Sequence, residues 1–190
     1  GVSMPRHRHW PVTMQAGGVV LRPLRCADQV RWTTTRELDW DWLGPWEATK
    51  PPGSRERVGG YLTMVSRNHR RAKGGSSLPW AIGWDDGWPD CPVANRATTP
   101  LIGQLTVSSI SLGSAMSCSM GYWVASAYAG KGIAPTAVAL ACDYVFQVIG
   151  LHRVEICVRP ENTKSLRVVE KLGLTEEGVR PAYLHIDGQW

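Results

Sequence analysis

The stretch that decides the fold of this chain reads Tyr122-Trp123-Val124, followed by Ala129-Gly130-Lys131-Gly132-Ile133-Ala134. β-branched and aromatic residues over 120–124 predict a strand. The glycines then open a helix, which Gly150 is expected to end, because apolar residues recur there at helical spacing: Val138, Ala141, Val145 and Val148. The local order is therefore strand, glycine turn, helix.

The glycine turn predicts a binding site for an anion. Glycines at the start of a helix leave backbone N–H groups uncovered by side chains, and the helix dipole adds about half a positive charge there. Lys131 adds a cation, so a phosphate or pyrophosphate is the natural ligand. A simple tight turn is the alternative. Neither G-x-x-x-x-G-K-[ST] nor G-x-G-x-x-G fits the spacing, which disfavours ATP hydrolysis and NAD binding.

Working outward, hydrophobic periodicity and turn residues predict the remaining elements. We expect strands over 18–24, 79–84, 101–107 and 153–159, and an irregular excursion over 85–100. A Ser-rich connection should join 101–107 to 120–124. Predicted helices run from an Asp28 cap to Leu38, from a Ser54 cap to Lys73 with Val58, Leu62 and Val65 on one face, and from an Asn162 cap to Gly173; an extended segment over 174–186 follows.

Composition bounds the class of protein. A chain of 190 residues with 43% hydrophobic and 19% charged residues is typical of one globular domain. No apolar run is long enough for a membrane span or a secretory signal, so we expect a soluble, cytoplasmic protein that binds no membrane. Five cysteines without a C-x-x-C pair predict reduced, mostly buried thiols, and the pair His7 and His9 is read as accidental, so no metal is expected.

The net charge of +5 is concentrated in one segment. Residues 50–73 hold one acid, Glu56, against seven bases: Lys50, Arg55, Arg57, Arg67, Arg70, Arg71 and Lys73. This pattern is typical of a solvated helix face. A patch for an anionic partner, such as RNA or a polyphosphate cofactor, is the other reading.

Four motifs together resemble the GNAT superfamily of N-acetyltransferases, and more narrowly its RimJ/RimL branch of ribosomal-protein alanine N-acetyltransferases. They are Tyr122-Trp123-Val124, residues 129–134, Arg159-Pro160-Glu161-Asn162 with Ser165, and Glu170-Lys171-Leu172-Gly173. The resemblance implies an α/β fold with a mixed, mostly antiparallel twisted sheet flanked by helices. It implies one domain over 17–190 after a flexible basic segment over 1–16. The family's last strand would lie beyond Trp190, so we expect that the chain is shortened, that further residues follow Trp190, or that a neighbouring molecule supplies the strand.

The resemblance also implies a site for acetyl-CoA. Val124 would pair through its backbone with the pantetheine arm, and Asn162 would hydrogen-bond the cofactor from the other side. The family usually has Gln or Arg where Ala129 stands, so one side-chain contact is lost. The backbone N–H groups of the turn would hold the pyrophosphate, in the segment Gly130, Lys131, Gly132, Ile133, Ala134, Pro135 and Thr136.

The implied reaction is direct attack of a neutral amine on the acetyl thioester. Ser165 falls where the branch places the acid that protonates the leaving thiolate, and a plain first-turn serine is the alternative. The aromatic segment with Trp40, Trp42 and Trp46 would lie at the acceptor cleft, although core packing also suits it. Candidates for the base are Glu155, His185 and Asp187, each of which also suits a structural role.

The resemblance favours a protein N-terminal α-amine as the acceptor, as on a ribosomal protein. A small-molecule amine, another acyl-CoA, and a non-catalytic module that binds acyl-CoA or the ribosome remain open. No DNA partner is expected, and a homodimer is compatible with the sequence.

Overall fold

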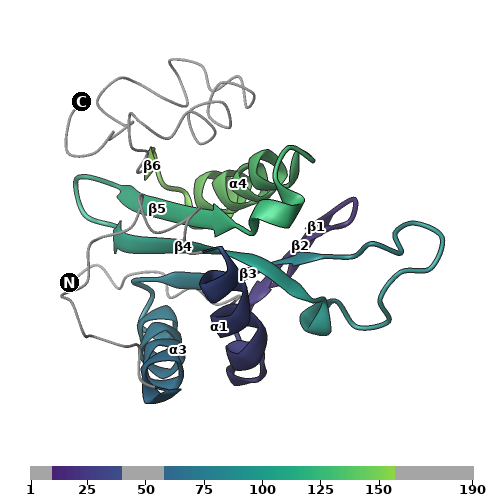
Figure 1. Ribbon diagram of the computed structural model, residues 1–190. Coiled ribbons are helices and arrows are strands. Elements are labelled where there is room, and N and C mark those ends of the chain that lie inside the picture. The colour runs from purple at the N-terminus through teal and green to yellow at the C-terminus, as the bar shows by residue number, and fades with distance from the viewer. Residues whose placement is uncertain (1–9, 40–57, 157–190) are drawn as a thin grey trace.

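The computed structural model describes residues 10–39 and 58–156, which form a curled mixed sheet flanked by helices (Figure 1). Strands follow one another across the sheet in chain order, and every neighbouring pair is antiparallel except β5 and β6, which are parallel. The strands of the described part are β1 (Met14–Ala16), β2 (Val19–Pro23), β3 (Leu78–Trp84), β4 (Leu101–Ser111), β5 (Ser117–Val124) and β6 (Arg153–Ile156). The predicted sheet class is confirmed.

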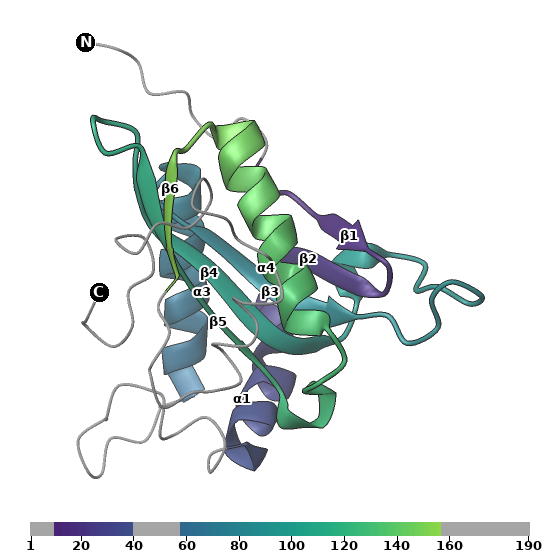
Figure 2. The ribbon, with the colours of Figure 1, turned by 90° about the horizontal axis from the view of Figure 1, so that it is seen from above.

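The helices lie on both faces of the sheet. α1 (Gln29–Leu38) and α3 (Val58–Lys73) cover one face, and α4 (Ile133–Asp143) crosses the other (Figures 1 and 2). α4 continues into a π-helical turn, η5 (Tyr144–Ile149), and supplies the crossover that a parallel pair of strands requires. Short 3₁₀ turns are η1 (Cys26–Asp28), η3 (Arg96–Thr98) and η4 (Ser126–Tyr128).

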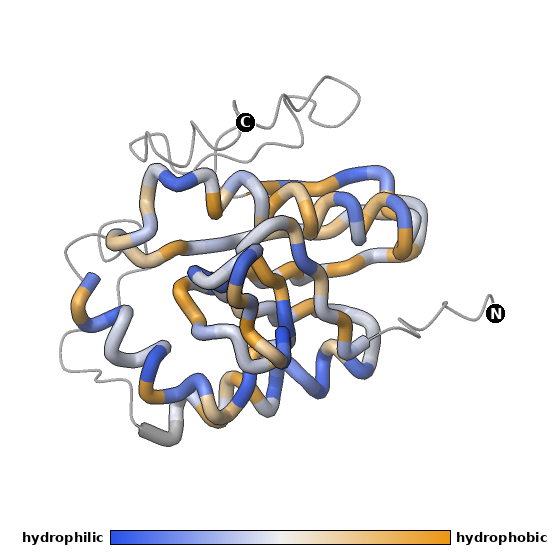
Figure 3. Tube along the Cα trace, turned by 90° about the vertical axis from the view of Figure 1, so that its right-hand side faces the viewer, coloured by the Kyte–Doolittle hydropathy of each residue, from blue (hydrophilic) through white to orange (hydrophobic). Residues whose placement is uncertain are grey.

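Two apolar clusters hold these layers together, because successive strand residues point to opposite faces of the sheet. The larger cluster lies under α4 and includes Trp80, Met120 and Val138. The smaller one lies under α1 and α3 and includes Trp32, Tyr61 and Val65. Hydrophobic and hydrophilic positions accordingly alternate along single elements (Figure 3).

This alternation assigns a face to each side chain near the end of β5. Cys118 and Met120 are buried in the cluster under α4, whereas Trp123 packs in the cluster under α1 and α3. In β6, Val154 and Ile156 are buried under α4. Glu155 therefore points to the face that carries α1 and α3, as does its register partner in β5.

Most predicted elements are confirmed, but two predicted apolar stripes are wrong at one position each. Leu62 of α3 is 40% exposed, because the buried stripe of this helix follows Tyr61, Val65 and Ala72 instead. Val148 is 53% exposed, since the helix changes to π geometry at Tyr144 and the core-facing positions there are Val145 and Ile149 instead. Gly150 does end the helix, with φ at +81°.

Two predicted irregular segments contain strand. Residues 14–16, expected within a flexible segment, form β1 and pair antiparallel with β2, so that expectation is wrong for them. The Ser-rich connection is shorter than expected, because Ser108 pairs with Ser119 and Ser111 pairs with Ser117. A period-two alternation of small polar residues suits a half-exposed sheet face as well as a loop.

The prediction of mostly buried cysteines holds for half of those described. Cys118 and Cys142 are buried, and burial raises the pKa of each thiol to about 12. Cys26 and Cys91 are exposed. The former lies in η1, and the latter lies in the irregular excursion over 85–100.

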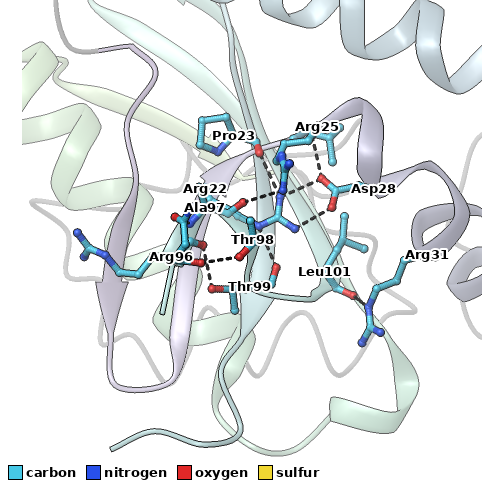
Figure 4. A network of polar contacts seen from close by, with 12 residues as sticks. Arg22, Pro23, Arg25, Asp28, Arg31, Arg96, Ala97, Thr98, Thr99 and Leu101 are labelled. Atoms are coloured by element: carbon cyan, nitrogen blue, oxygen red, sulfur yellow. Dashed lines mark hydrogen bonds and ion pairs between the residues drawn. The ribbon is translucent and has the colours of Figure 1, made fainter. Parts of the chain in front are cut away.

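A buried ion pair joins β2 to the start of α1 (Figure 4). Asp28 stands at the N-cap position of α1, but its side chain does not cap that helix. Its carboxylate binds the guanidinium of Arg22 in a two-pronged contact, at 2.8 and 2.9 Å, and accepts a hydrogen bond from the Arg25 N–H at 2.8 Å. Arg22 also donates through Nε to the carbonyl of Thr99 at 2.9 Å. The predicted Asp28 cap of α1 is therefore replaced by an ion pair.

The described part of the basic segment lies on α3. Its basic side chains are exposed on the side of the helix away from the buried stripe: Arg67, Arg70, Arg71 and Lys73. Among the described residues, no helix combines the length and apolar composition needed to cross a bilayer.

Candidate functional site

The candidate site begins where β5 ends and the chain turns back toward α4. The N–H of Ala125 donates to the Ile102 carbonyl at 2.8 Å, which extends the pairing of β4 and β5 by one step. The 3₁₀ turn η4 follows, closed by hydrogen bonds from Tyr128 to Ala125 and from Ala129 to Ser126. This turn delivers the chain to the glycine segment at the start of α4.

Gly130 and Gly132 give the turn its shape. Their φ angles are +79° and +76°, in the left-handed region that side chains rarely adopt. A Cβ built on either residue would meet no heavy atom of the described residues within 4 Å. Gly132 is the N-cap of α4 and has no side chain to occupy the helix N-terminus.

The N-terminus of α4 is left with unused donors. Among the described residues, the backbone N–H groups of residues 130–134 have no hydrogen-bond acceptor. Pro135 has no N–H, and Thr136 donates its N–H and its hydroxyl to the Gly132 carbonyl at 3.2 and 2.8 Å. The sequence predicted backbone donors from Gly130 to Thr136, and the structure narrows them to residues 130–134. These N–H groups are uncovered at the positive end of a helix dipole, where they suit an anion.

Lys131 is the cation of this turn. Its side chain is exposed, and Nζ lies 5.5 Å from the ring centroid of Tyr128, which holds the charge near the helix N-terminus. No group of three or more His, Cys, Asp or Glu side chains forms a metal site within the described ranges. The candidate site therefore offers backbone donors and one lysine.

Val124, the last residue of β5, offers a strand edge next to the turn. On one side, Val124 pairs with Gly103 of β4. On the other side, the register with β6 runs from Ser117 to Met120 only. At Val124, the edge toward β6 has no ladder partner in the part of the chain that the structure describes, and this edge suits an extended ligand that carries amide groups.

α1 approaches this strand end from the opposite face of the sheet. Gln104 Oε1 accepts from the indole N–H of Trp32 at 2.9 Å and from that of Trp123 at 3.2 Å. The guanidinium carbon of Arg36 lies 4.9 and 5.2 Å from the centroids of these two indoles. Through these contacts, Gln104 and Arg36 hold α1 against β4 and β5.

Sequence reasoning missed Asp39, the residue that follows α1. It is 8% exposed, and its carboxylate accepts hydrogen bonds from the backbone N–H and the hydroxyl of Ser126, both at 2.7 Å. A sequence signal was available, because an acid at the C-terminal end of a helix opposes the helix dipole and needs a compensating partner. The partner itself could not be predicted, because it lies 87 residues away in the chain.

Several predicted site residues lie outside the described residues. These are Trp42 and Trp46 of the acceptor segment, Asn162, Ser165, and the candidate bases His185 and Asp187. The third candidate base, Glu155, is half-buried and lies in register with Ser119, on the face that carries α1.

Comparison with known proteins gives the class of protein to which this fold and site belong. The family model for the acetyltransferase (GNAT) domain matches residues 19–175, which is most of the chain. This chain belongs to the GNAT acetyltransferase family.

The chain is similar to a solved structure over nearly its whole length. RimJ of Mycobacterium smegmatis, in complex with CoA-disulfide, superposes with a TM-score of 0.74 at 34% identity, over 95% of this chain and 84% of that one.

Curated relatives match over smaller shares. The [ribosomal protein uS5]-alanine N-acetyltransferase of Escherichia coli is 29% identical over 78% of this chain and 70% of its own length. The probable N-acetyltransferase YjcK of Bacillus subtilis is 40% identical over 47% of this chain, and the match spans half of YjcK. The spermidine N(1)-acetyltransferase of E. coli is 40% identical over 33% of this chain and 34% of its own length.

Proposed function

We propose that this protein transfers an acetyl group from acetyl-CoA to a primary amine, and that the amine is the N-terminal α-amine of a protein. The observation that carries the proposal is the glycine turn of a GNAT family member, whose N–H groups at residues 130–134 are uncovered at the start of α4. In this proposal the turn binds the pyrophosphate of CoA, and the free edge of β5 at Val124 pairs with the pantetheine arm.

The proposed chemistry is a direct displacement. The amine nitrogen forms a bond to the thioester carbon, the carbon–sulfur bond breaks, and the CoA thiolate leaves and takes up a proton. We propose Ser165 as the donor of that proton, on the strength of the sequence resemblance. The amine must lose a proton, and Glu155 stays a candidate for the base because its side chain shares a sheet face with α1.

The choice of acceptor rests on sequence coverage and on charge. The match to the uS5-alanine acetyltransferase covers 78% of this chain, whereas the match to the spermidine acetyltransferase covers 33%. Arg31 and Arg36 of α1 lie against β4 and β5, and cations disfavour a polycationic acceptor there. The exposed basic side chains of α3 also suit docking on an RNA-rich particle such as the ribosome.

An α-amine also places a smaller demand on the base. With a pKa of about 7.7–8.0, roughly a tenth of an α-amine is neutral at pH 7, whereas a lysine of pKa about 10.4 is neutral at a level of about 10⁻⁴ to 10⁻³. A weak or water-relayed base is therefore sufficient for a protein N-terminus.

Peptide acetylation followed by mass spectrometry tests both parts of the proposal. Peptides with a free N-terminal Ala or Ser should be acetylated faster than the same peptides with a blocked N-terminus and an internal lysine. Preferred acetylation of the lysine, or of spermidine, would refute the α-amine acceptor and leave the acetyltransferase assignment in place. CoA binding without turnover on any amine would favour a non-catalytic module, and turnover with another acyl-CoA alone would reassign the donor.

A further inference from the structure

A buried carboxylate lies at an unfavourable place in this molecule. Asp39 follows the last residue of α1, where the helix dipole is negative, and it is 8% exposed. Both the dipole and the loss of hydration raise the free energy of its charged form. The two hydrogen bonds from Ser126, each 2.7 Å long, offset that cost.

These two bonds also tie η4 to α1, while Tyr128 of η4 packs against the apolar cluster under α4. In the described ranges, the other hydrogen bonds of η4 are local ones to residues 125 and 129, and those that reach another element both end on Asp39. The N–H groups at the start of α4 follow within a few residues. Asp39 therefore anchors the chain between the free edge of β5 and the glycine turn.

α1 holds the end of β5 at two points. Arg36 stacks on Trp123, the residue before Val124, and Asp39 binds Ser126, two residues after it. Farther up the helix, Arg31 Nε donates to the Leu101 carbonyl and Trp32 donates to Gln104. The position of Val124 relative to the turn is thus set by a helix that is itself fixed to β4.

We propose that Asp39 is a positioning residue for CoA: by holding Ser126, its carboxylate sets the spacing between the β5 edge at Val124 and the backbone donors of residues 130–134. This inference rests on the proposed function, in which the pantetheine arm uses the first of these sites and the pyrophosphate uses the second. A ligand that spans both sites depends on their spacing, whereas a ligand that uses the glycine turn alone does not.

The test compares two probes on the same variants by titration calorimetry. CoA spans both sites, and its nucleotide half, adenosine 3′-phosphate 5′-diphosphate, lacks the pantetheine arm. Asp39→Asn replaces two charge-assisted hydrogen bonds by neutral ones, with Oδ1 left to accept from the Ser126 N–H and the amide N–H₂ left to face the hydroxyl. It should weaken CoA binding about tenfold, which is about 1.4 kcal/mol. The affinity for the nucleotide half should change less than about twofold. Ser126→Ala removes one of the two bonds and should give a smaller loss, and Ser126→Thr should restore CoA binding.

Asp85 supplies a matched control. It is also a buried carboxylate, 4% exposed, and it accepts backbone N–H groups from Gly87 at 3.1 Å and from Val93 at 2.8 Å, but it lies in the excursion over 85–100. Asp85→Asn should lower the melting temperature as Asp39→Asn does and leave the affinity for CoA unchanged.

The outcomes separate the inference from the proposed function. A wild-type protein that bound neither probe would overturn the cofactor site and the inference with it. The role of Asp39 alone would be overturned if Asp39→Asn bound CoA as tightly as the wild-type protein does. It would also be overturned if Asp39→Asn lost as much affinity for the nucleotide half as for CoA. If Asp39→Asn does not fold, the comparison of Ser126→Ala with Ser126→Thr decides the same question.

Discussion

Breaking the buried ion pair between Arg22 and Asp28 should destabilise the fold strongly. The Arg22 side chain is 1% exposed and that of Asp28 is 9% exposed, so neither group can turn to solvent without local opening. Asp28→Asn keeps the shape of the side chain and removes its charge, which leaves the guanidinium of Arg22 buried without a counter-ion. Removing one partner of a buried pair costs about 3–5 kcal/mol.

The expected size of the effect in a melting experiment follows from that cost. For a domain of 150–250 residues, 1 kcal/mol shifts the melting temperature by about 2–4 °C, so Asp28→Asn should lower it by about 6–20 °C. The pair also fixes the loop before β4, since Arg22 donates to the Thr99 carbonyl at 2.9 Å, and the loss should therefore be global. Thermal unfolding followed by circular dichroism measures it.

Two further variants test whether the loss of stability comes from the unpaired buried charge. The double variant Arg22→Met with Asp28→Leu removes both charges and should recover much of the loss, because hydrophobic replacements of a buried pair are often neutral. Glu37→Gln on the exposed side of α1 removes a negative charge without breaking a buried pair and should leave the melting temperature nearly unchanged. A loss below about 1 kcal/mol for Asp28→Asn, or a double variant less stable than the single one, would refute the account.

Two predictions concern the cofactor and the chemistry. Gly132→Leu should abolish CoA binding in calorimetry, because its side chain would enter the open space in front of the α4 donors. Gly150→Leu is its matched control, since Gly150 also has a left-handed φ, +81°, and a Cβ there would meet no heavy atom of the described residues within 4 Å. It should share the backbone strain of about 1–2 kcal/mol and bind CoA normally. Unchanged CoA affinity in folded Gly132→Leu would remove the turn from the cofactor site. Ser165→Ala should lower kcat about 10²–10⁴-fold in steady-state assays with CoA affinity retained, and an equal kcat would return Ser165 to a structural role.

The sequence by itself determined the local features of this protein. Gly130 and Gly132 predicted a turn before a helix, and both have the positive φ that few other residues adopt without strain. β-branched and aromatic runs bounded by turn residues predicted most strands of the sheet, and alternation of apolar and polar residues predicted the strand that begins at Arg153. The same reasoning failed at Leu62 and Val148, because the side on which a helix is buried depends on what it packs against.

The tertiary structure alone decided which distant groups meet. Asp28 has the residue type and position of a helix cap, yet it pairs with Arg22, because a buried guanidinium requires a counter-ion more than a helix end requires a cap. Asp39 lies 87 residues from Ser126 in the chain, and it contacts η4 only because α1 packs across the ends of β4 and β5. Periodicity and turn chemistry act over a few residues, whereas these polar pairs form only once the sheet has brought its strand ends together.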